Sequence, residues 1–319
     1  MHFQLTDDQR ALRDGVRALL EGRFGRQALR IALDTPGLDR TLWRELGEAG
    51  FFALTLPEAE GGVGLGLPEA VLAFEQAGRV LLPGPLVATH LAADARVPGA
   101  ATGEAVVTAV QGGLVEWLDE ADVVRGDASG AVPLRSVDPL TPLHRVPDGG
   151  GRDRSADPPA DPLADLPADL PADLPADPLA VLLTAAEQLG SASRTCELAV
   201  QHARTREQFG RPVGAFQAVK HLCAAMLERV GTARAAVYAA AVTADPLDIA
   251  AARLLADEAA LHGARDCLQV HGGMGFTWES DVHLHLKRAW VRARRSGDVT
   301  QSEEMLAGDL LGDPPGAAA

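Results

Sequence analysis

The sequence predicts a mainly helical protein with a short β-rich middle region and a C-terminal four-helix bundle. Three observations support this fold class. Apolar residues recur at helical spacing near both ends, short Val-rich runs lie between them, and a Pro- and Asp-rich stretch precedes the second helical part. We therefore expect a helical domain over residues 1–100, a β-like region over 101–150, a linker over 151–178 and the bundle over 179–312.

The N-terminal domain opens with a helix start signal. Thr6 is followed three residues later by Gln9, which is a capping-box pattern, and apolar residues then recur at helical spacing. A second helical stretch over 42–49 ends at Gly50, and a third apolar helix over 68–80 follows a Gly-rich turn. These signals predict a small helical unit.

The middle of the chain has a different texture. Residues 106–110, 123–124 and 132–134 are short β-prone runs separated by Gly, Asp and Pro, which predicts a few short strands. A repeat of the form Ala-Asp-Leu-Pro then runs over 164–177. Because proline fixes φ and removes an amide donor, we expect this repeat to be an extended linker.

Four Ala- and Leu-rich segments follow from Leu179 onward. They are separated by turn signals at 210–214, 245–246 and 272–275. Long helices joined by short loops pack as antiparallel neighbours, so the sequence predicts a bundle.

Composition restricts the possible partners and sites. The chain has 29 Lys plus Arg against 44 Asp plus Glu, a formal net charge of -15 that disfavours nucleic acid and anionic membranes. A local basic cluster over 287–295 fits either phosphate contacts or a solvated helix face. The three cysteines lack metal-ligand spacing, and we expect no metal site. Without a signal segment or an apolar run of about 20 residues, we expect a cytoplasmic protein.

A first constellation with possible chemistry comprises Arg206, Phe209, Gly210 and Gln217. It lies where one predicted helix ends and the next begins. A guanidinium there can hold a diphosphate through two parallel hydrogen bonds, which lysine cannot reproduce. The structural alternative is a helix-terminal Arg, a Gly cap and a core Phe.

A second constellation is the stretch Gln269-Val270-His271-Gly272-Gly273-Met274-Gly275, at the end of a long helical pattern. Paired glycines allow positive φ and bring backbone amides close to an anionic or ring ligand. The alternative here is a helix terminator. By itself the motif is as weak as any short Gly-rich loop.

Taken together and in this order, the two motifs resemble the C-terminal domain of acyl-CoA dehydrogenases. The N-terminal half is similar to the helical entry domain of the same family, in Trp43, the turn at 56–58, the glycines at 61–64 and the stretch 74–79. The resemblance implies FAD as the cofactor and α,β-desaturation of an acyl-CoA thioester as the reaction. It also implies that contacts to the adenosine diphosphate of an FAD bound mainly by a neighbouring subunit come from Arg206, Phe209, Gln217, Gln269, Gly272 and Gly273.

Other parts of the sequence depart from the family pattern. The family's usual catalytic Glu aligns with Gly297, and Asp298 beside it is turned by roughly 100° on a helix. The second known position of that Glu aligns with Ala180, and Glu187 is roughly two turns away, about 10 Å along the axis. The middle region is truncated and lacks the family's loop around the flavin ring. We therefore expect no catalytic base in this chain.

The favoured hypothesis is a subunit of a hetero-oligomeric acyl-CoA dehydrogenase, expected to be a tetramer, that acts on a bulky acyl-CoA such as a steroid side chain. A longer partner subunit would supply the catalytic base. One alternative is a self-sufficient homo-oligomeric enzyme that uses Asp298, Glu303 or Glu304 as a displaced base. The other is a non-catalytic scaffold in which Arg206 and Gln269 are helix caps.

Overall fold

Five helices build the N-terminal part of the protein, whose computed structural model describes residues 4–147, 177–295 and 299–312. Most of the predicted linker lies outside the described residues. Helix α1 begins with the predicted capping box, in which the Gln9 amide donates to the Thr6 hydroxyl oxygen at 3.1 Å. The helices are α1 (Asp7–Arg23), α2 (Arg26–Asp34), α3 (Arg40–Glu48), α4 (Leu67–Val80) and α5 (Leu86–Asp94).

A small five-stranded sheet follows, with the strand order β3-β1-β2-β5-β4. Its β1 and β3 pair in parallel, with Val107 opposite Val123, and the other pairs are antiparallel. The three predicted Val-rich runs contribute β1, β3 and β4, whereas β2 and β5, with the sequences Leu-Val-Glu and Leu-His-Arg, lack such a signal and were not predicted. The strands are β1 (Val107–Gln111), β2 (Leu114–Glu116), β3 (Val123–Arg125), β4 (Val132–Leu134) and β5 (Leu143–Arg145).

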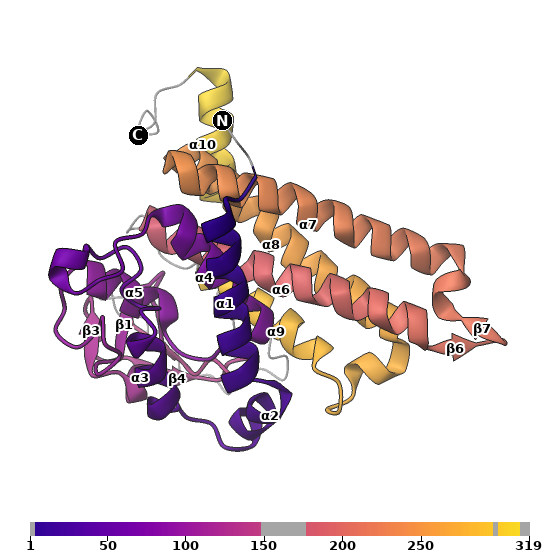
Figure 1. Cartoon of the computed structure of the whole chain (residues 1–319), viewed down its shortest axis with the longest axis horizontal. Coiled ribbons are helices and arrows are strands. Elements are labelled where there is room, and N and C mark those ends of the chain that lie inside the picture. The colour runs from indigo at the N-terminus through magenta and orange to yellow at the C-terminus, as the bar shows by residue number, and fades with distance from the viewer. Residues whose placement is uncertain (1–3, 148–176, 296–298, 313–319) are drawn as a thin grey trace.

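The C-terminal part is a bundle of long helices packed beside α4 (Figure 1). Two of them begin with Asp and then Pro: the Asp177 and Asp245 carboxylates accept hydrogen bonds from backbone amides of the first turn, at 2.9 and 2.8 Å. The sequence predicted four helices, and α10 is a shorter fifth one. They are α6 (Pro178–Thr205), α7 (Gln217–Thr243), α8 (Pro246–His271), α9 (Val282–Arg295) and α10 (Val299–Leu311).

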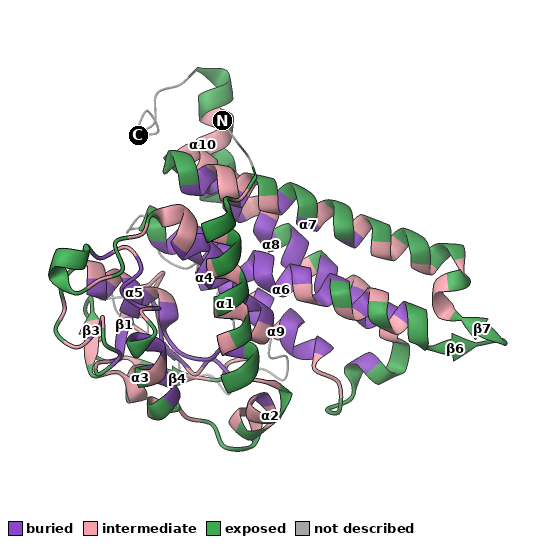
Figure 2. Ribbon diagram, viewed as in Figure 1, coloured by how far each residue is buried: buried purple, intermediate pink, exposed green. Residues whose placement is uncertain are grey.

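Two glycines allow α4 and α6 to touch along their backbones. A Cβ on Gly78 would lie 1.9 Å from the Glu187 carbonyl oxygen, and one on Gly190 would lie 1.9 Å from that of Glu75. The middle of α6 is therefore almost completely buried, whereas the far end of the bundle is exposed (Figure 2). The predicted fold class, mainly helical with a small sheet and a helical C-terminal part, is confirmed.

Candidate cofactor-contact site

The first predicted motif forms a tight hairpin between α6 and α7. Strands β6 (Glu207–Gln208) and β7 (Arg211–Pro212) pair around Phe209 and Gly210, whose φ values of 55° and 76° are those of a two-residue hairpin turn. A phenylalanine rarely adopts positive φ, and the Phe209 side chain is 90% exposed. The Phe209 ring is therefore not part of the core of this chain and is accessible to a ligand.

Arg206 occupies the C-cap of α6, directly before the hairpin. Its backbone N–H donates to the His202 carbonyl oxygen at 2.8 Å, which fixes the point from which the side chain leaves the helix. The side chain is exposed, and no carboxylate among the described residues pairs with it. Gln217, the first residue of α7, is exposed as well.

The second motif ends α8 and continues as the short 3-10 helix η4 (Gly272–Phe276). Gly272 has φ 60° and ψ −147°, a conformation that only glycine adopts readily. A Cβ added to Gly272 or Gly273 would meet no atom of this chain within 4 Å. Both glycines and Gln269 are exposed, so an external ligand can approach this backbone closely.

The fold brings the two motifs to one end of the bundle (Figure 1). The rings of His202 on α6 and His271 on α8 stack there with centroids 4.1 Å apart. The six predicted residues thus come from two neighbouring helix ends and one helix start.

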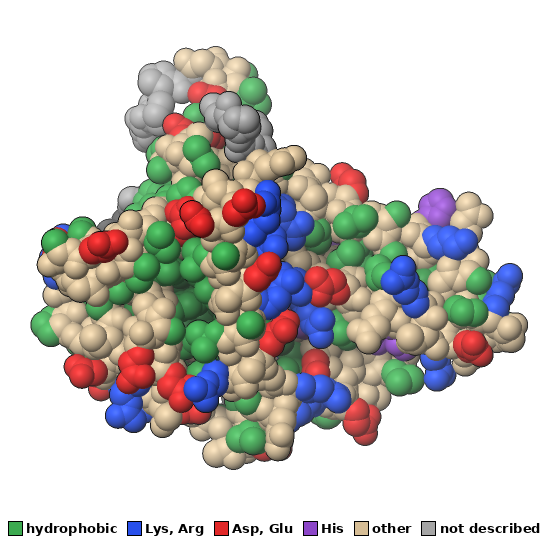
Figure 3. Space-filling view, in the orientation of Figure 1, with side chains coloured by type: hydrophobic (Ala, Val, Ile, Leu, Met, Phe, Trp, Pro, Cys, Tyr) green, Lys and Arg blue, Asp and Glu red, His purple; other side chains and the backbone are tan. Residues whose placement is uncertain are grey.

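This end of the bundle is basic, although the chain as a whole is acidic. Figure 3 shows Lys and Arg side chains on the face of the bundle that it displays. The hairpin carries one acid, Glu207, which the exposed cations of the hairpin and the adjoining helix ends outnumber. These cations are Arg204, Arg206, Arg211, Lys220 and Arg265. An unpaired guanidinium, open glycine backbone and an exposed aromatic ring together fit the diphosphate and ring system of FAD.

The positions predicted for a catalytic base offer no carboxylate within the described residues. Ala180 is buried in the first turn of α6, whereas Gly297 and Asp298 lie outside the described residues. Glu303 and Glu304 are exposed on α10, beside Ser302, which accepts a hydrogen bond from Arg253 of α8. A base that removes a weakly acidic proton works best when it is shielded from water, which these two side chains are not.

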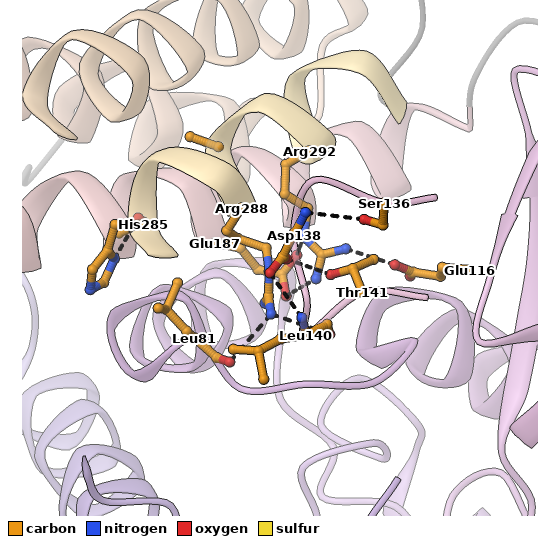
Figure 4. Close-up of polar contacts among 12 residues, drawn as sticks. Leu81, Glu116, Ser136, Asp138, Leu140, Thr141, Glu187, His285, Arg288 and Arg292 are labelled. Carbon is orange, nitrogen blue, oxygen red and sulfur yellow. Dashed lines mark hydrogen bonds and ion pairs between the residues drawn. The ribbon is translucent and has the colours of Figure 1, made fainter. Parts of the chain in front are cut away.

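Three arginines of the basic cluster on α9 lie neither at a phosphate site nor on a solvated face, so both interpretations were wrong for them, whereas Arg294 is exposed. Arg288 and Arg292 are buried where the sheet meets the bundle (Figure 4), and Arg295 of the same helix is buried as well. They face three buried acids from other elements.

The contacts in this junction are direct. Arg292 lies 3.0 Å from the Glu116 carboxylate of β2 and 3.1 Å from that of Glu187 on α6, and Arg295 also reaches Glu116 at 2.6 Å. Arg288 pairs with Asp138 and donates to the Leu82 carbonyl oxygen at 3.1 Å. Glu187 is thus part of a charge-balanced network and is unavailable as a base.

Asp138 is a residue of this network whose role the sequence did not reveal. The segment 137–142 is a turn in which the Asp138 carboxylate accepts hydrogen bonds from the Leu140 amide and the Thr141 hydroxyl. This turn aims the carboxylate at Arg288, so it anchors the sheet to α9.

Two hollows lie on the described surface, and both are away from the six predicted residues. One, of about 940 Å³, lies between α2 and the loop before α9, where Arg26 and Arg30 already pair with Asp281. The other, of about 360 Å³, is an apolar hollow between α2 and α3. Among the described residues, no His, Cys, Asp or Glu cluster suits a metal ion, and no helix is long and apolar enough to cross a membrane.

Comparison with known proteins agrees with these features. Residues 6–97 match the family described as acyl-CoA dehydrogenase, N-terminal domain, and residues 181–297 match acyl-CoA dehydrogenase, C-terminal domain. The chain is 38% identical over 305 residues to acyl-CoA dehydrogenase IpdE2 of Mycobacterium tuberculosis, covering 89% of this chain and 91% of that protein. The chain belongs to the acyl-CoA dehydrogenase family. The predicted enzyme class, an oxidoreductase acting on CH–CH groups, and FAD as its cofactor are confirmed at the level of the family.

Two further proteins are similar to this chain, one in sequence and one in structure. Acyl-CoA dehydrogenase FadE34 of Mycobacterium tuberculosis is 34% identical over 340 residues, which cover 89% of this chain but only 45% of that protein. A solved structure described as the Tcur3481-Tcur3483 steroid ACAD superposes with a TM-score of 0.77 and 25% identity, covering 98% of this chain and 99% of that chain.

Proposed function

We propose that this chain is a subunit of a hetero-oligomeric, FAD-dependent acyl-CoA dehydrogenase. It contributes contacts to the FAD diphosphate, while a longer partner subunit supplies the catalytic base and the thioester pocket. The proposal rests chiefly on one contrast: the residues expected to contact FAD are exposed and unpaired at the bundle end, whereas Glu187 is enclosed in a buried ion network. A surface open to a ligand, in a chain whose Glu187 is already held by an arginine, suits a shared site.

The substrate class that we propose is a bulky acyl-CoA, such as the thioester of a steroid side chain. This part rests on similarity to the steroid ACAD named above, whose chain is matched along 99% of its length and whose printed name joins two polypeptides. FadE34 bears on the shared site and not on the substrate, because a sequence similar to this chain occurs there within a longer protein.

In the proposed reaction the acyl-CoA loses an α-proton to a carboxylate and a β-hydride to the flavin, giving an α,β-unsaturated thioester. This chain holds the diphosphate through the guanidinium of Arg206 and the open backbone at Gly272 and Gly273. The Phe209 ring and the Gln217 and Gln269 amides border the same ligand. Fixing the cofactor in this way orients the reacting ring in the partner without a proton transfer in this chain.

Co-expression with a longer acyl-CoA dehydrogenase-like partner tests which chain supplies the base. We expect the complex to keep its acyl-CoA-dependent flavin reduction when Glu303 and Glu304 are both changed to Gln, because these exposed groups take no part in the reaction. Loss of flavin reduction with retained FAD would favour the displaced-base alternative. Substituting carboxylates of the partner one at a time then identifies the base.

The scaffold alternative makes a separate prediction. If Arg206 and Gln269 were only helix caps, Arg206→Ala would leave the flavin content of the purified complex unchanged. Under our proposal the same variant assembles and loses FAD, since a charged hydrogen-bonded contact is worth about 1.5–3 kcal/mol.

A further inference from the structure

A pair of histidines lies between the two cofactor-contact motifs. His202 is one turn before Arg206 on the same face of α6, and His271 immediately precedes Gly272. Their rings are stacked, with centroids 4.1 Å apart and planes inclined by 29°. Both rings are half-buried, so each keeps an exposed part toward the end of the bundle.

The hydrogen bonding of His271 fixes its tautomer. Its Nδ1 lies 2.8 Å from the Cys267 carbonyl oxygen, which can only accept, so Nδ1 carries the proton. The nearby Cys267 Sγ is 3.6 Å away, and burial raises the pKa of this thiol to about 12, which keeps it neutral. Nε2 is therefore the nitrogen that gains a proton when His271 becomes charged.

The surroundings of His202 oppose its protonation in the free chain. Partial burial, followed by the proximity of His271 and Arg206, lowers the pKa of His202. Two stacked imidazolium rings would repel each other at this separation. On the packed faces of α8 and α7, Asp266 is held by Arg229 at 2.8 Å, and burial raises the pKa of the Cys223 thiol.

We propose that His202 and His271 complete the diphosphate site as a stacked pair that takes up a proton when the ligand binds. The inference rests on the proposed function. A dinucleotide diphosphate bears one negative charge on each phosphate; Arg206 offsets one, and the protonated pair offsets the other. Ligand binding and protonation then favour each other reciprocally, so affinity rises as pH falls, by up to about tenfold per pH unit for one linked proton.

The test uses the co-expressed complex after its FAD has been removed. FAD is titrated calorimetrically at several pH values between 6 and 8, in buffers that differ in ionisation enthalpy, so that the protons taken up are counted. We expect proton uptake with the wild-type complex and none with the double variant His202→Gln/His271→Gln, which removes both rings of the pair. The matched control His262→Gln changes an exposed histidine about 13 Å along α8 from His271 and should behave as wild type.

Coenzyme A also carries a diphosphate, so a second arm titrates CoA in place of FAD. Proton uptake with CoA and not with FAD would assign the pair to the thioester and overturn the proposal. Equal pH dependence in the wild type and the double variant His202→Gln/His271→Gln would overturn it as well. As a check that needs no variant, the imidazole NMR signals of the wild-type pair should titrate at a higher pH once FAD is bound.

These outcomes are separable from a failure of the proposed function. Arg206→Ala that binds FAD as well as the wild type would contradict the shared diphosphate site itself. FAD binding that depends on Arg206 but takes up no proton would leave that site standing and reject only the role of the histidine pair.

Discussion

Two arginine-rich regions of this chain have opposite environments. On α9, Arg288, Arg292 and Arg295 are buried and paired with acids from the sheet, its turn and α6. At the bundle end, Arg206 is exposed and unpaired among the described residues, beside open glycine backbone. Arginine clusters must therefore be interpreted through their partners: the first holds the sheet to the bundle, and the second is open to an anion, as the proposed function requires.

The largest expected effect is on the buried region. Arg292→Leu leaves Glu116 and Glu187 buried without their shared cation, so we expect the free energy of unfolding to fall by about 3–5 kcal/mol. Urea unfolding followed by circular dichroism measures it. Arg294→Leu is the matched control, because Arg294 is exposed on the same helix, and its effect should stay within about 0.5 kcal/mol. Equal effects of the two variants would contradict the buried network.

In the exposed region we expect a substitution to change FAD binding and not stability. Arg206→Ala removes a charged contact to the ligand but none within the chain, so we expect weaker FAD binding, by roughly 10- to 100-fold, at unchanged stability. Flavin absorbance per complex and FAD titration measure this change. Arg204→Ala removes another exposed cation of the same helix turn and should reduce binding far less. If both variants bind FAD equally, general electrostatics and not a specific contact attracts the cofactor.

A buried histidine of α9 makes the stability of the buried region depend on pH. His285 is 3% exposed and lies 2.9 Å from the Ser191 hydroxyl, and burial lowers its pKa to about 3. The pKa of His285 in the folded protein lies below its pKa in the unfolded chain. Its contribution to the free energy of unfolding is therefore fully present above pH 6.5 and is lost on acidification, by about 1.4 kcal/mol per pH unit.

Unfolding measurements from pH 7 to pH 5 on the wild type and His285→Gln reveal this slope as a difference. The opposite contribution of Asp257, whose pKa burial raises to about 6, is common to both proteins and cancels. His262→Gln, at an exposed position, should keep the wild-type slope. Parallel curves for all three proteins would show that His285 is not held neutral by the fold.

The smallest expected effect on stability belongs to Gly273. An added methyl group meets no atom of this chain, so Gly273→Ala should unfold within about 0.5 kcal/mol of the wild type. FAD content of the complex should nevertheless fall, because the methyl group occupies space left for the ligand. Gly231→Ala, at an open position of α7, is the control that should retain FAD.

The fold was predictable where local signals are strong. The capping box at Thr6, the Asp-Pro starts of α6 and α8 and the glycine breaks between helices each specify their element within a few residues. Strands β2 and β5 were missed because Leu-Val-Glu and Leu-His-Arg include charged or polar residues and no run of β-branched ones. Their place in the sheet depends on pairing between segments distant in sequence.

The exposed motif residues were predictable as a group, but the buried network was not. Its acids come from three elements distant in sequence, so no local pattern joins Glu116, Asp138 and Glu187 to α9. A usable signal did exist: Arg288, Arg292 and Arg295 recur at i, i+4 and i+7 on one face of a helix that contains no acid of its own. The histidine pair needed the fold, because His202 and His271 are on different helices.

The most direct test of the shared-site account is the flavin absorbance of this chain purified alone, compared with the chain co-expressed with a longer acyl-CoA dehydrogenase-like partner. The account predicts a colourless lone chain and a yellow complex whose flavin is bleached by an acyl-CoA. A yellow lone chain that an acyl-CoA bleaches would contradict it, because both the flavin site and the base would then reside in this chain.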